Sequence, residues 1–312
     1  MKINISIVIV SYNVATLLCQ CIDSIYRSNI NIIGINNHLL KNVQYPNVEI
    51  IVIDSCSNDN TISEITKYKE VKIILNNTNI GISKGNNIGV ERSKGEYIFL
   101  LNPDTILFDN TIIELYNYHE IYKNVGVVGP LTYNTDGSFQ PTRRRFHRLR
   151  DIVFTLNHQS QSERIFKNDI LKDYYYSEYN YTDTFDVDWL QSSAMLIKRQ
   201  VFDDIGYFDE NFFMYYDEID WCFRAKRHGW EIYYIGYSSI IHHQGKSSIK
   251  SPSAKYYNQS KIYYFRKNYG IKAGFIVFIL VHLNLGIPLV IRLLQNLFII
   301  SEEVKTRCLM RK

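Results

Sequence analysis

The 312-residue sequence has few of the residues that mark disulfide-stapled, fibrous or disordered chains. It contains five cysteines, an odd number, with no Cys-x-x-Cys pair and no Cys/His spacing typical of zinc, which favours free thiols in a reducing compartment. Prolines number 6 and glycines 15, and no period of about 20–50 residues recurs, so a collagen-like or repeat architecture is excluded. Apolar residues make up 46% and charged residues 21%, the composition of an ordinary globular protein.

The N-terminus lacks the features of a secretory signal peptide. The short apolar run of residues 3–10 follows a single lysine and continues into Ser11-Tyr12-Asn13 without a small-residue cleavage site. Its density of β-branched residues predicts a buried first strand instead. We therefore expect the protein to be cytoplasmic.

Charge is nearly balanced. The 35 basic and 31 acidic residues give a net charge of +4, too small to indicate nucleic acid as a partner. Residues 271–312 carry this surplus alone, with six basic and two acidic side chains. Inside them, Ala273–Ile291 is a run of nineteen uncharged residues, close to the roughly 20 needed to cross a bilayer. Because polar residues and Pro288 lower its hydrophobicity, we favour a helical hairpin or in-plane anchor at a membrane surface over a membrane span or an oligomerisation helix.

The first 130 residues alternate between two kinds of segment. Runs rich in β-branched residues predict strands at Ile5–Val10, Val48–Ile53, Val71–Leu75, Tyr97–Leu101 and Val125–Val128. Segments with helical spacing lie between them, at Val14–Arg27, Thr61–Lys69, Lys84–Ser93 and Thr111–Tyr122. Apolar strands separated by helices indicate an α/β fold with a mostly parallel central sheet, whose ligands bind at the carboxyl ends of the strands. The Asn-rich stretch Ser28–Pro46 is predicted to be a surface loop.

Regular periodicity fades between Thr132 and Thr184, which we interpret as a mobile, variable insertion. Its basic run Arg143–Arg150 leaves three roles open: a solvated loop, a contact with the phosphates of a donor or lipid carrier, or a contact with nucleic acid. Order returns in the second half, at Val187–Ile197, in a helix around Asp217–His228, in a strand over Trp230–Ile241 and in a helix over Ala254–Asn268.

Two acidic residues stand where a parallel sheet places its ligands. Asp54 ends the strand at residues 49–53 and opens a polar turn, while Asp104 follows the strand at 97–101 and Pro103, which cannot continue the ladder. A carboxylate at this edge would repel a diphosphate unless a divalent cation lay between them. Mg²⁺ or Mn²⁺ fits such oxygen ligands.

Residues 79–89, between these two acids, combine glycines with asparagines. Gly81 and two further glycines at a helix start would let the backbone approach a ligand, and amides such as Asn79 and Asn87 can hydrogen-bond a ribose or base edge. Lys84 lies in the same segment. The Gly-x-Gly-x-x-Gly pattern is absent, so we do not expect a dinucleotide fold.

An acidic cluster, Asp217-Glu218-Ile219-Asp220, opens the helix predicted in the second half. Acidic residues are favoured at helix starts by about 0.3–1 kcal/mol each, but three in four residues after an aromatic run exceed that need. Crowded carboxylates in partly apolar surroundings raise one another's pKa, which suits a general base.

These motifs together resemble the GT-A glycosyltransferases of family 2, most of all their rhamnosyltransferase-like branch. The order and spacing are shared by Ser11-Tyr12-Asn13, Asp54-Ser55-Cys56-Ser57, Asn79-x-Gly81 and Asn102-Pro103-Asp104. The second half agrees through Trp189–Arg199, Gly206–Arg224 and His242-x-x-Gly245-x-Ser247. The resemblance covers about residues 3–270.

The resemblance implies a GT-A, Rossmann-like nucleotide-diphospho-sugar transferase fold over residues 1–270. Its parts would be a nucleotide-sugar-binding half (1–130), the insertion (131–185) and an acceptor and catalytic half (186–270), followed by a membrane-associating helical tail (271–312). The implied activity is inverting, metal-dependent transfer from a dTDP-rhamnose-like or UDP-hexose donor to a glycan or polyprenyl-diphosphate-linked acceptor in surface polysaccharide synthesis. The enzyme would then act at the inner face of the cell membrane. Whether it forms a homo-oligomer is left open. The alternative is a non-catalytic protein of the same fold that binds nucleotide sugars or glycans.

The resemblance also assigns roles to residues on the donor side. Asp54 would accept a hydrogen bond from the imide N–H of a uracil or thymine base. Asp104 would be the acid of the metal-binding motif, and His242 a further ligand of the metal or diphosphate, with His243 as the alternative. The implied nucleotide-sugar site comprises Ser11, Tyr12, Asn13, Asp54, Asn79, Gly81, Lys84, Asn87 and Asn102.

Acceptor-side roles follow from the same resemblance. The family motif usually reads Glu-Asp, whereas this chain has Asp217-Glu218. The aligned position favours Glu218 as the base with Asp217 orienting it, and the reversed order leaves the choice between them open. Trp189 would stack on an acceptor sugar ring, with core packing as the equal alternative, and Asp220 is a further candidate for acceptor binding.

Overall fold

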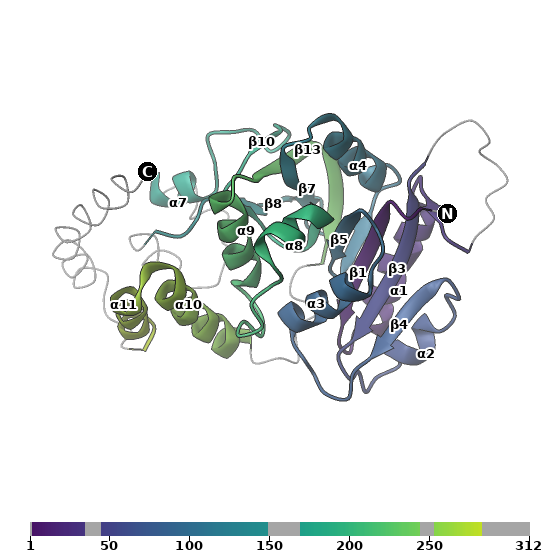
Figure 1. The fold of residues 1–312 in the computed structure, drawn as a ribbon, viewed down its shortest axis with the longest axis horizontal. Coiled ribbons are helices and arrows are strands. Elements are labelled where there is room, and N and C mark those ends of the chain that lie inside the picture. Colours follow the sequence, from purple (N-terminus) through teal and green to yellow (C-terminus); the bar gives the residue numbers. More distant parts are fainter. Residues whose placement is uncertain (1, 35–44, 149–168, 244–252, 283–312) are drawn as a thin grey trace.

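The computed structural model describes residues 2–34, 45–148, 169–243 and 253–282 (Figure 1). Three parts of the expected features lie outside the described residues: Gly245 and Ser247, the tail from residue 283 onward, and the last two residues of the basic run.

A mixed sheet runs through both halves of the chain. Within the described residues it has eleven strands, with the path β10-β13-β7-β12-β5-β1-β3-β2 and with β4, β6 and β8 paired at its sides. A separate two-stranded sheet pairs β11 with β9. The strands are β1 (Ile5–Ser11), β2 (Asn31–Ile32), β3 (Asn47–Asp54), β4 (Val71–Leu75), β5 (Tyr97–Leu101), β6 (Thr105–Leu107), β7 (Val125–Tyr133), β8 (Phe139–Gln140), β9 (Arg143–Arg144), β10 (Phe185–Asp186), β11 (Trp189–Leu190), β12 (Ala194–Lys198) and β13 (Glu231–His242).

The first half is the parallel part of this sheet, as the apolar strands predict. β1 pairs in parallel with β3 and β5, and β3 with β4. β12 then inserts antiparallel between β5 and β7, and β13 joins β7 in parallel. The second half of the chain therefore extends the sheet of the first half instead of forming a sheet of its own.

Helices cover both faces of the sheet. They are α1 (Ala15–Arg27), α2 (Thr61–Ile65), α3 (Ile82–Arg92), α4 (Thr111–Ile121), α7 (Asp169–Tyr174), α8 (Arg199–Ile205), α9 (Asp217–Arg227), α10 (Ser253–Tyr269) and α11 (Ile271–His282). Alternate residues of β1 point to opposite faces, so Ile7 packs in one core with α1 and α4 while Val8 packs in the other with α3, α8 and α9. Figure 1 shows α8 and α9 adjacent on the same side of the sheet, and α10 paired with α11.

Glycines bring α3 close to β1. A Cβ at Gly89 would lie 2.1 Å from a methyl carbon of Val8, and one at Gly85 would lie 2.7 Å from Val10. These two glycines therefore allow the helix to pack against the strand. The sequence predicted that they would let the backbone approach a ligand, and the structure does not support that role for them.

Two local expectations in the first half need correction. The helix expected over Thr61–Lys69 ends at Ile65. The stretch Ser28–Pro46, predicted to be a loop, contributes β2, which pairs in parallel with β3.

The region interpreted as an insertion is structured wherever it is described. The expected boundary at residue 131 falls inside β7, and β8, β9 and α7 follow. Arg143, His147, Tyr174 and Tyr176 are all less than 5% exposed. The interpretation as a region without order is therefore wrong for this part, because its core is built from arginine and aromatic side chains that leave no aliphatic periodicity in the sequence.

The described part of the expected tail is packed against the domain. α11 lies on α10, where Ala273, Val277 and Leu280 are buried in the core and a Cβ at Gly274 would lie 2.6 Å from Arg266 Cβ. No helix among the described residues has the length and apolarity needed to cross a bilayer.

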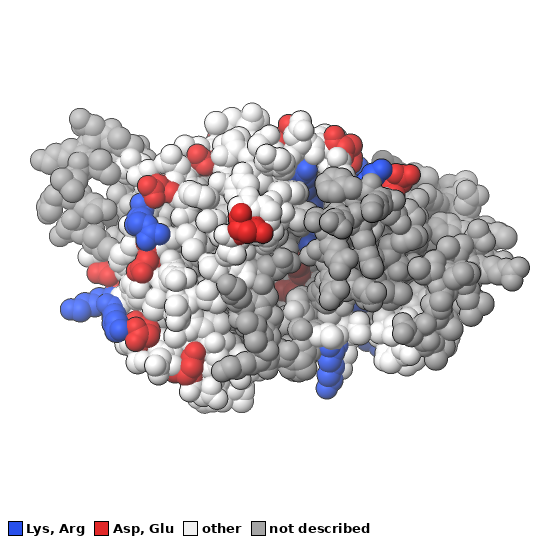
Figure 2. Space-filling view, turned by 180° about the vertical axis from the view of Figure 1, so that it is seen from behind, with Lys and Arg blue, Asp and Glu red and all other residues white. Residues whose placement is uncertain are grey.

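Charged side chains are dispersed on the face opposite to that of Figure 1. Over the described part of that face, acidic and basic residues are interspersed, and neither sign forms a continuous patch (Figure 2).

Candidate active site

Asp54, the candidate for base recognition, lies at the carboxyl end of β3 beside the end of β1. Ser11 and Asp54 are register partners, and the Ser11 hydroxyl donates to the Asp54 carboxylate over 3.2 Å. Ser57 donates its backbone N–H and its hydroxyl to the same carboxylate at 2.8 and 2.6 Å. These bonds hold Asp54 in one orientation and leave it lone pairs for a ligand.

The Ser11-Tyr12-Asn13 motif and the Asp54 turn form one hydrogen-bonded unit. Asn13 has a left-handed backbone (φ 53°), which asparagine tolerates. Its N–H donates to Ser57 Oγ at 2.9 Å, and its Oδ1 accepts the Asn58 N–H at 2.8 Å. Tyr12 between them is half-buried. The two motifs are therefore parts of one wall at the ends of β1 and β3.

Strand pairing brings Asp104 and His242 together. β6 follows Asp104 and pairs antiparallel with the end of β13, which sets Thr105 opposite His242. His242 Nε2 lies 3.3 Å from Asp104 Oδ1, and both side chains are at most 4% exposed. His243 contributes its backbone N–H to the Asp104 carbonyl at 2.9 Å. His242 is thus the histidine whose ring reaches the Asp104 carboxylate.

Gln140 determines how His242 presents its ring. The Gln140 side-chain nitrogen donates to Asn134 Oδ1 at 2.7 Å and to the His242 carbonyl at 3.3 Å, so its Oε1 faces the imidazole. His242 Nδ1 lies 2.7 Å from that oxygen and must carry the proton of a neutral ring. The Nε2 lone pair is then directed at a carboxylate oxygen of Asp104. A nitrogen lone pair and a carboxylate oxygen repel each other at this distance unless a proton or a cation lies between them.

This pair fits a divalent cation. Carboxylate oxygens suit Mg²⁺ and Mn²⁺, and a neutral imidazole oriented by a hydrogen bond at its other nitrogen is a common metal ligand. Among the residues that the structure describes, no group of three or more His, Cys, Asp or Glu side chains could hold a metal. Asp104 and His242 would therefore supply two ligands, and phosphate oxygens and water the remainder.

Asp217 and Glu218 open α9 and are only 2% and 8% exposed. Two consecutive left-handed tyrosines, Tyr215 (φ 67°) and Tyr216 (φ 65°), lead the chain into the helix. Such conformations cost about 1–3 kcal/mol each and concentrate at functional sites. Asp217 Oδ2 and Glu218 Oε2 are buried without a hydrogen-bond partner in the described part of the chain. Buried carboxylate oxygens of this kind require a proton or a ligand.

The two carboxyl groups titrate as a pair. Burial raises the pKa of Asp217 from 3.8 to about 6, although hydrogen bonds from Glu218 and the backbone oppose the rise. Burial also raises the pKa of Glu218 well above its usual 4.5, and the Asp217 charge adds to that rise. The pair therefore shares one proton near neutral pH and carries about one negative charge. It can take a proton from a substrate hydroxyl.

The start of α3 packs against the segment that leads into this acid pair. Gly81 has φ 78°, and a Cβ there would lie 2.4 Å from the Phe213 carbonyl oxygen, which accepts the Ile82 N–H at 2.9 Å. The Ser83 hydroxyl donates to the Phe212 carbonyl at 2.5 Å, and its proximity lowers the pKa of Asp217. Gly81 is thus required for contact between two parts of the chain.

The remaining residues predicted to bind the nucleotide sugar differ in exposure and in how many of their polar atoms are already hydrogen-bonded within the chain. Asn79 and Lys84 are exposed and Asn102 is half-buried. Asn87 is 5% exposed, donates to the Phe208 carbonyl at 2.9 Å and accepts the Phe208 N–H at 3.0 Å. Because both ends of its amide are used within the chain, Asn87 is a structural link, and its predicted contact with the nucleotide is not supported.

Two side chains expected to contact the acceptor are part of the core. Trp189 is 1% exposed and donates its Nε1–H to the Arg145 carbonyl at 2.8 Å, so the alternative of core packing applies. Asp220 is fully buried and forms ion pairs with Lys267 at 2.9 Å and Arg224 at 3.2 Å. The pair with Lys267 ties α9 to α10, and both pairs occupy the carboxylate, so the structure gives no support to the prediction that Asp220 binds the acceptor.

The segment Gln140–Arg144 connects the two candidate centres. At the first end of the segment, Gln140 hydrogen-bonds the ring of His242. At the other end, Arg144 is close enough to the acid pair for its charge to oppose the rise in the pKa of Glu218. A chain rises at most about 3.3–3.6 Å per residue, so the backbones of these two positions lie no more than about 14 Å apart. Sequence reasoning missed Gln140 and placed Arg144 only in a basic run, because no local pattern marks the partner of a distant side chain.

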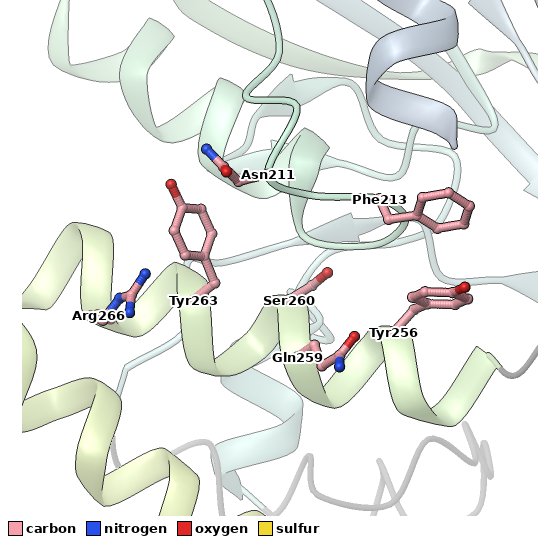
Figure 3. A pocket seen from close by; sticks show the side chains of 7 residues that line it. All are labelled: Asn211, Phe213, Tyr256, Gln259, Ser260, Tyr263 and Arg266. Atoms are coloured by element: carbon pink, nitrogen blue, oxygen red, sulfur yellow. The ribbon is translucent and has the colours of Figure 1, made fainter. Parts of the chain in front are cut away.

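A pocket of about 370 Å³ lies between residues 211–213 and one face of α10 (Figure 3). Phe213 and Tyr256 stack at 4.5 Å on one side of it. None of the residues predicted for the site line this pocket. The candidate site is therefore defined by its hydrogen bonds and charges.

Replacing Asp217 by asparagine is expected to stabilise the protein above pH 6. Because the folded state holds a proton on Asp217 more tightly than the unfolded state does, the free energy of unfolding falls as pH rises from about 4 to about 6. A rise in pKa from 3.8 to about 6 corresponds to at most about 3 kcal/mol, which the variant would regain at pH 8.

Urea unfolding at pH 4.5 and 8 measures this effect. The exposed Asp203→Asn is the matched control and should keep the wild-type pH slope. If the free energy of unfolding of Asp217→Asn falls with pH as steeply as that of the wild type, the Asp217 carboxyl does not cause the pH dependence.

Comparison with known proteins places the chain among glycosyltransferases. Residues 6–206 match the family Glycosyl transferase family 2. The low-salt glycan biosynthesis hexosyltransferase Agl10 of Haloferax volcanii is 29% identical over 63% of this chain, which spans only 59% of Agl10. The N-acetylglucosaminyl-diphospho-decaprenol L-rhamnosyltransferase of Mycobacterium tuberculosis is 24% identical over 66% of this chain and 70% of its own length. The dTDP-rhamnosyl transferase RfbF of Shigella flexneri is 24% identical over 80% of this chain and 82% of RfbF.

Solved structures agree on the fold. The mannosyltransferase PcManGT of Pyrobaculum calidifontis, solved with GDP-Man and Mn²⁺, superposes with a TM-score of 0.55 at 15% identity, over 93% of this chain and 72% of that one. The expected GT-A fold is confirmed, and the family match covers more than half of the chain. The chain belongs to glycosyl transferase family 2.

Proposed function

We propose that this glycosyltransferase is an inverting, metal-dependent enzyme, and that Asp217 and Glu218 supply its general base. The observation that carries the proposal is the buried acid pair at the start of α9, with one unpartnered oxygen on each carboxyl group and raised pKa values. A protein that only binds sugars has no need for two such costly carboxylates.

On the donor side, Asp54 accepts the imide N–H of a uracil or thymine base, and Ser11 and Ser57 hold it in position. Asp104 and His242 would hold Mg²⁺ or Mn²⁺, with Gln140 fixing the tautomer of His242. The bound cation supplies positive charge that neutralises the departing nucleoside diphosphate. The Mn²⁺ bound with GDP-Man in the PcManGT structure supports the use of a divalent cation with this fold.

On the acceptor side, the acid pair takes the proton of the attacking hydroxyl. The hydroxyl oxygen then bonds to the anomeric carbon as the bond from that carbon to the diphosphate oxygen breaks. A single displacement of this kind inverts the anomeric configuration. Base catalysis of this type contributes about 10²–10⁴-fold to the rate.

The substrates we propose are a dTDP-rhamnose-like or UDP-hexose donor and a glycan or polyprenyl-diphosphate-linked acceptor in surface polysaccharide synthesis. The rhamnosyltransferases of M. tuberculosis and S. flexneri among the relatives support rhamnose as the donor sugar, and the first of them supports a diphospho-lipid acceptor. We further propose that the enzyme acts at the inner face of the cell membrane. Ile271, Phe275 and Phe278, spaced along α11, are 80%, 62% and 46% exposed and could rest on a lipid surface.

A panel of dTDP-, UDP- and GDP-sugars, each with and without Mn²⁺, tests this function. The true donor is expected to protect the protein against thermal unfolding, by about 2.7 kcal/mol at 100 times its Kd, and to release nucleoside diphosphate when acceptor is present. A panel in which no nucleotide sugar protects the protein or is consumed would refute the proposal.

A further inference from the structure

We propose that Arg144 binds a phosphate group of the acceptor, on the same side of the site as the hydroxyl that Asp217 and Glu218 deprotonate. This inference rests on the proposed function and adds the place at which a phosphate-linked acceptor is recognised. It also assigns a role within the basic run Arg143–Arg150.

The three consecutive arginines at the start of this run have different surroundings. Arg143 is 2% exposed, and three aromatic rings enclose its guanidinium at 4.8–5.3 Å. Arg145 forms ion pairs with Asp173 and Glu178, both at 2.8 Å. Arg144, between them, forms no ion pair with any residue in the described ranges. Acidic side chains thus neutralise Arg145, and Arg143 is closed off from solvent among its rings, whereas Arg144 is partly exposed and can meet an anion.

The Arg144 guanidinium is held in place while most of its donors remain unused. The rings of Trp189 and Tyr175 lie 4.9 and 5.5 Å from it. Its two hydrogen bonds, to Pro141 and Gln191, are long at 3.3 and 3.4 Å, and its buried Nε has no partner in the described part of the chain. A guanidinium carries five N–H donors in a planar fork that matches a phosphate group. Arg144 is therefore preorganised for an oxyanion.

The position of this fork is beside the acid pair. Arg144 is the register partner of Trp189 across β9 and β11, and α9 packs on β11. From Trp189 the ring contacts continue through His147, at 6.3 Å, to Tyr216, at a further 5.3 Å. Tyr216 immediately precedes Asp217. The charges of Arg144 and Glu218 also shift each other's pKa in the directions expected of opposite charges.

A second cation lies in the same cluster. Lys261 is fully buried, with its Nζ 4.6 Å from the ring centre of Tyr257. Burial lowers the pKa of Lys261 to about 7. Burial also lowers the pKa of His147, and the charges of Lys261 and Arg144 lower it further. An anion bound here would favour the protonated lysine. The cluster can thus accept negative charge in addition to that of the acid pair.

The phosphate bound here belongs to the acceptor and not to the donor. The donor diphosphate is assigned to Asp104 and His242, and the His242 ring is held by Gln140 in β8, whereas Arg144 lies four residues further along the chain in β9. Arg144 instead lies next to the base, where the acceptor must present its hydroxyl.

Calorimetric titration with farnesyl diphosphate, a soluble prenyl diphosphate, tests the inference. The titration is made with the donor site saturated by dTDP or UDP and Mn²⁺, so that only the acceptor side is free. Wild-type protein should bind, and Arg144→Gln should bind about 10- to 100-fold more weakly. Arg144→Lys should lie between them, because lysine keeps the charge without the planar fork. Arg148→Gln, in the same run and 51% exposed, is the matched control and should bind as wild type.

The outcomes separate this inference from the function on which it rests. Equal affinities of wild type and Arg144→Gln, or no binding by wild type, would overturn the role of Arg144 if nucleotide and Mn²⁺ still bind. If no nucleoside diphosphate binds with Mn²⁺, the proposed function fails and this inference with it. Should Arg144→Gln not fold, as judged by circular dichroism, Arg144→Lys carries the same comparison.

Discussion

Replacing Glu218 by glutamine is expected to lower kcat for sugar transfer by about 10²–10⁴-fold and to leave donor binding nearly unchanged. The amide keeps the shape of the side chain but cannot accept the proton of the acceptor hydroxyl. Steady-state kinetics with the donor found in the panel measure kcat, and protection against unfolding measures donor binding. Glu91→Gln, an exposed carboxylate on α3, is the matched control and should retain full activity.

The companion variant Asp217→Asn decides which member of the pair is the base. At the base position an amide removes the proton acceptor, and most of the rate is lost. At the orienting position it leaves a carboxylate without an acidic neighbour, so the pKa of the remaining group falls. In a pH–rate profile of this variant, Glu218 should titrate at a lower pH than it does in the wild type, because the Asp217 charge no longer raises its pKa. Wild-type kcat in both variants would contradict the assignment of the pair.

Asp104→Asn is expected to abolish metal-dependent turnover, with a loss of at least about 100-fold. The amide preserves the volume of a side chain that is 1% exposed but removes the charge that attracts the cation. Chelation of the metal should have the same effect on the wild type, and Mn²⁺ should restore it. Asp109→Asn, an exposed residue five positions along the chain, should behave as wild type.

The paired variants His242→Ala and His243→Ala test the same centre independently of turnover. Mn²⁺ affinity, measured by electron paramagnetic resonance in the presence of nucleoside diphosphate, should fall in His242→Ala and change little in His243→Ala. Full activity of Asp104→Asn with the metal chelated would count against metal dependence.

The parallel half of the fold could be predicted because its physics is local. The strands from Ile5 to Leu101 are mostly apolar and segments with helical spacing separate them, so their type and order follow from periodicity. The same reasoning places Asp54 and Asp104 at strand ends, since a parallel sheet aligns those ends at one edge.

The remaining structure depends on contacts between distant residues. Asp220 resembles its acidic neighbours in sequence, yet its role is set by Lys267 on another helix. Arg143 belongs to a basic run, yet aromatic rings from three separate segments bury it. Gln140 becomes important only because β8 pairs with β7 beside β13. Sequence spacing carries no information on such pairings, so these residues required the structure.

The most direct measurement is a crystal structure with dTDP and Mn²⁺, in which anomalous scattering locates the metal. The account predicts a manganese peak between Asp104 and His242 Nε2, the thymine imide on Asp54, and the Asp217–Glu218 pair facing the diphosphate across one cleft. A manganese ion bound elsewhere, or acidic residues that open onto separate surfaces, would contradict it.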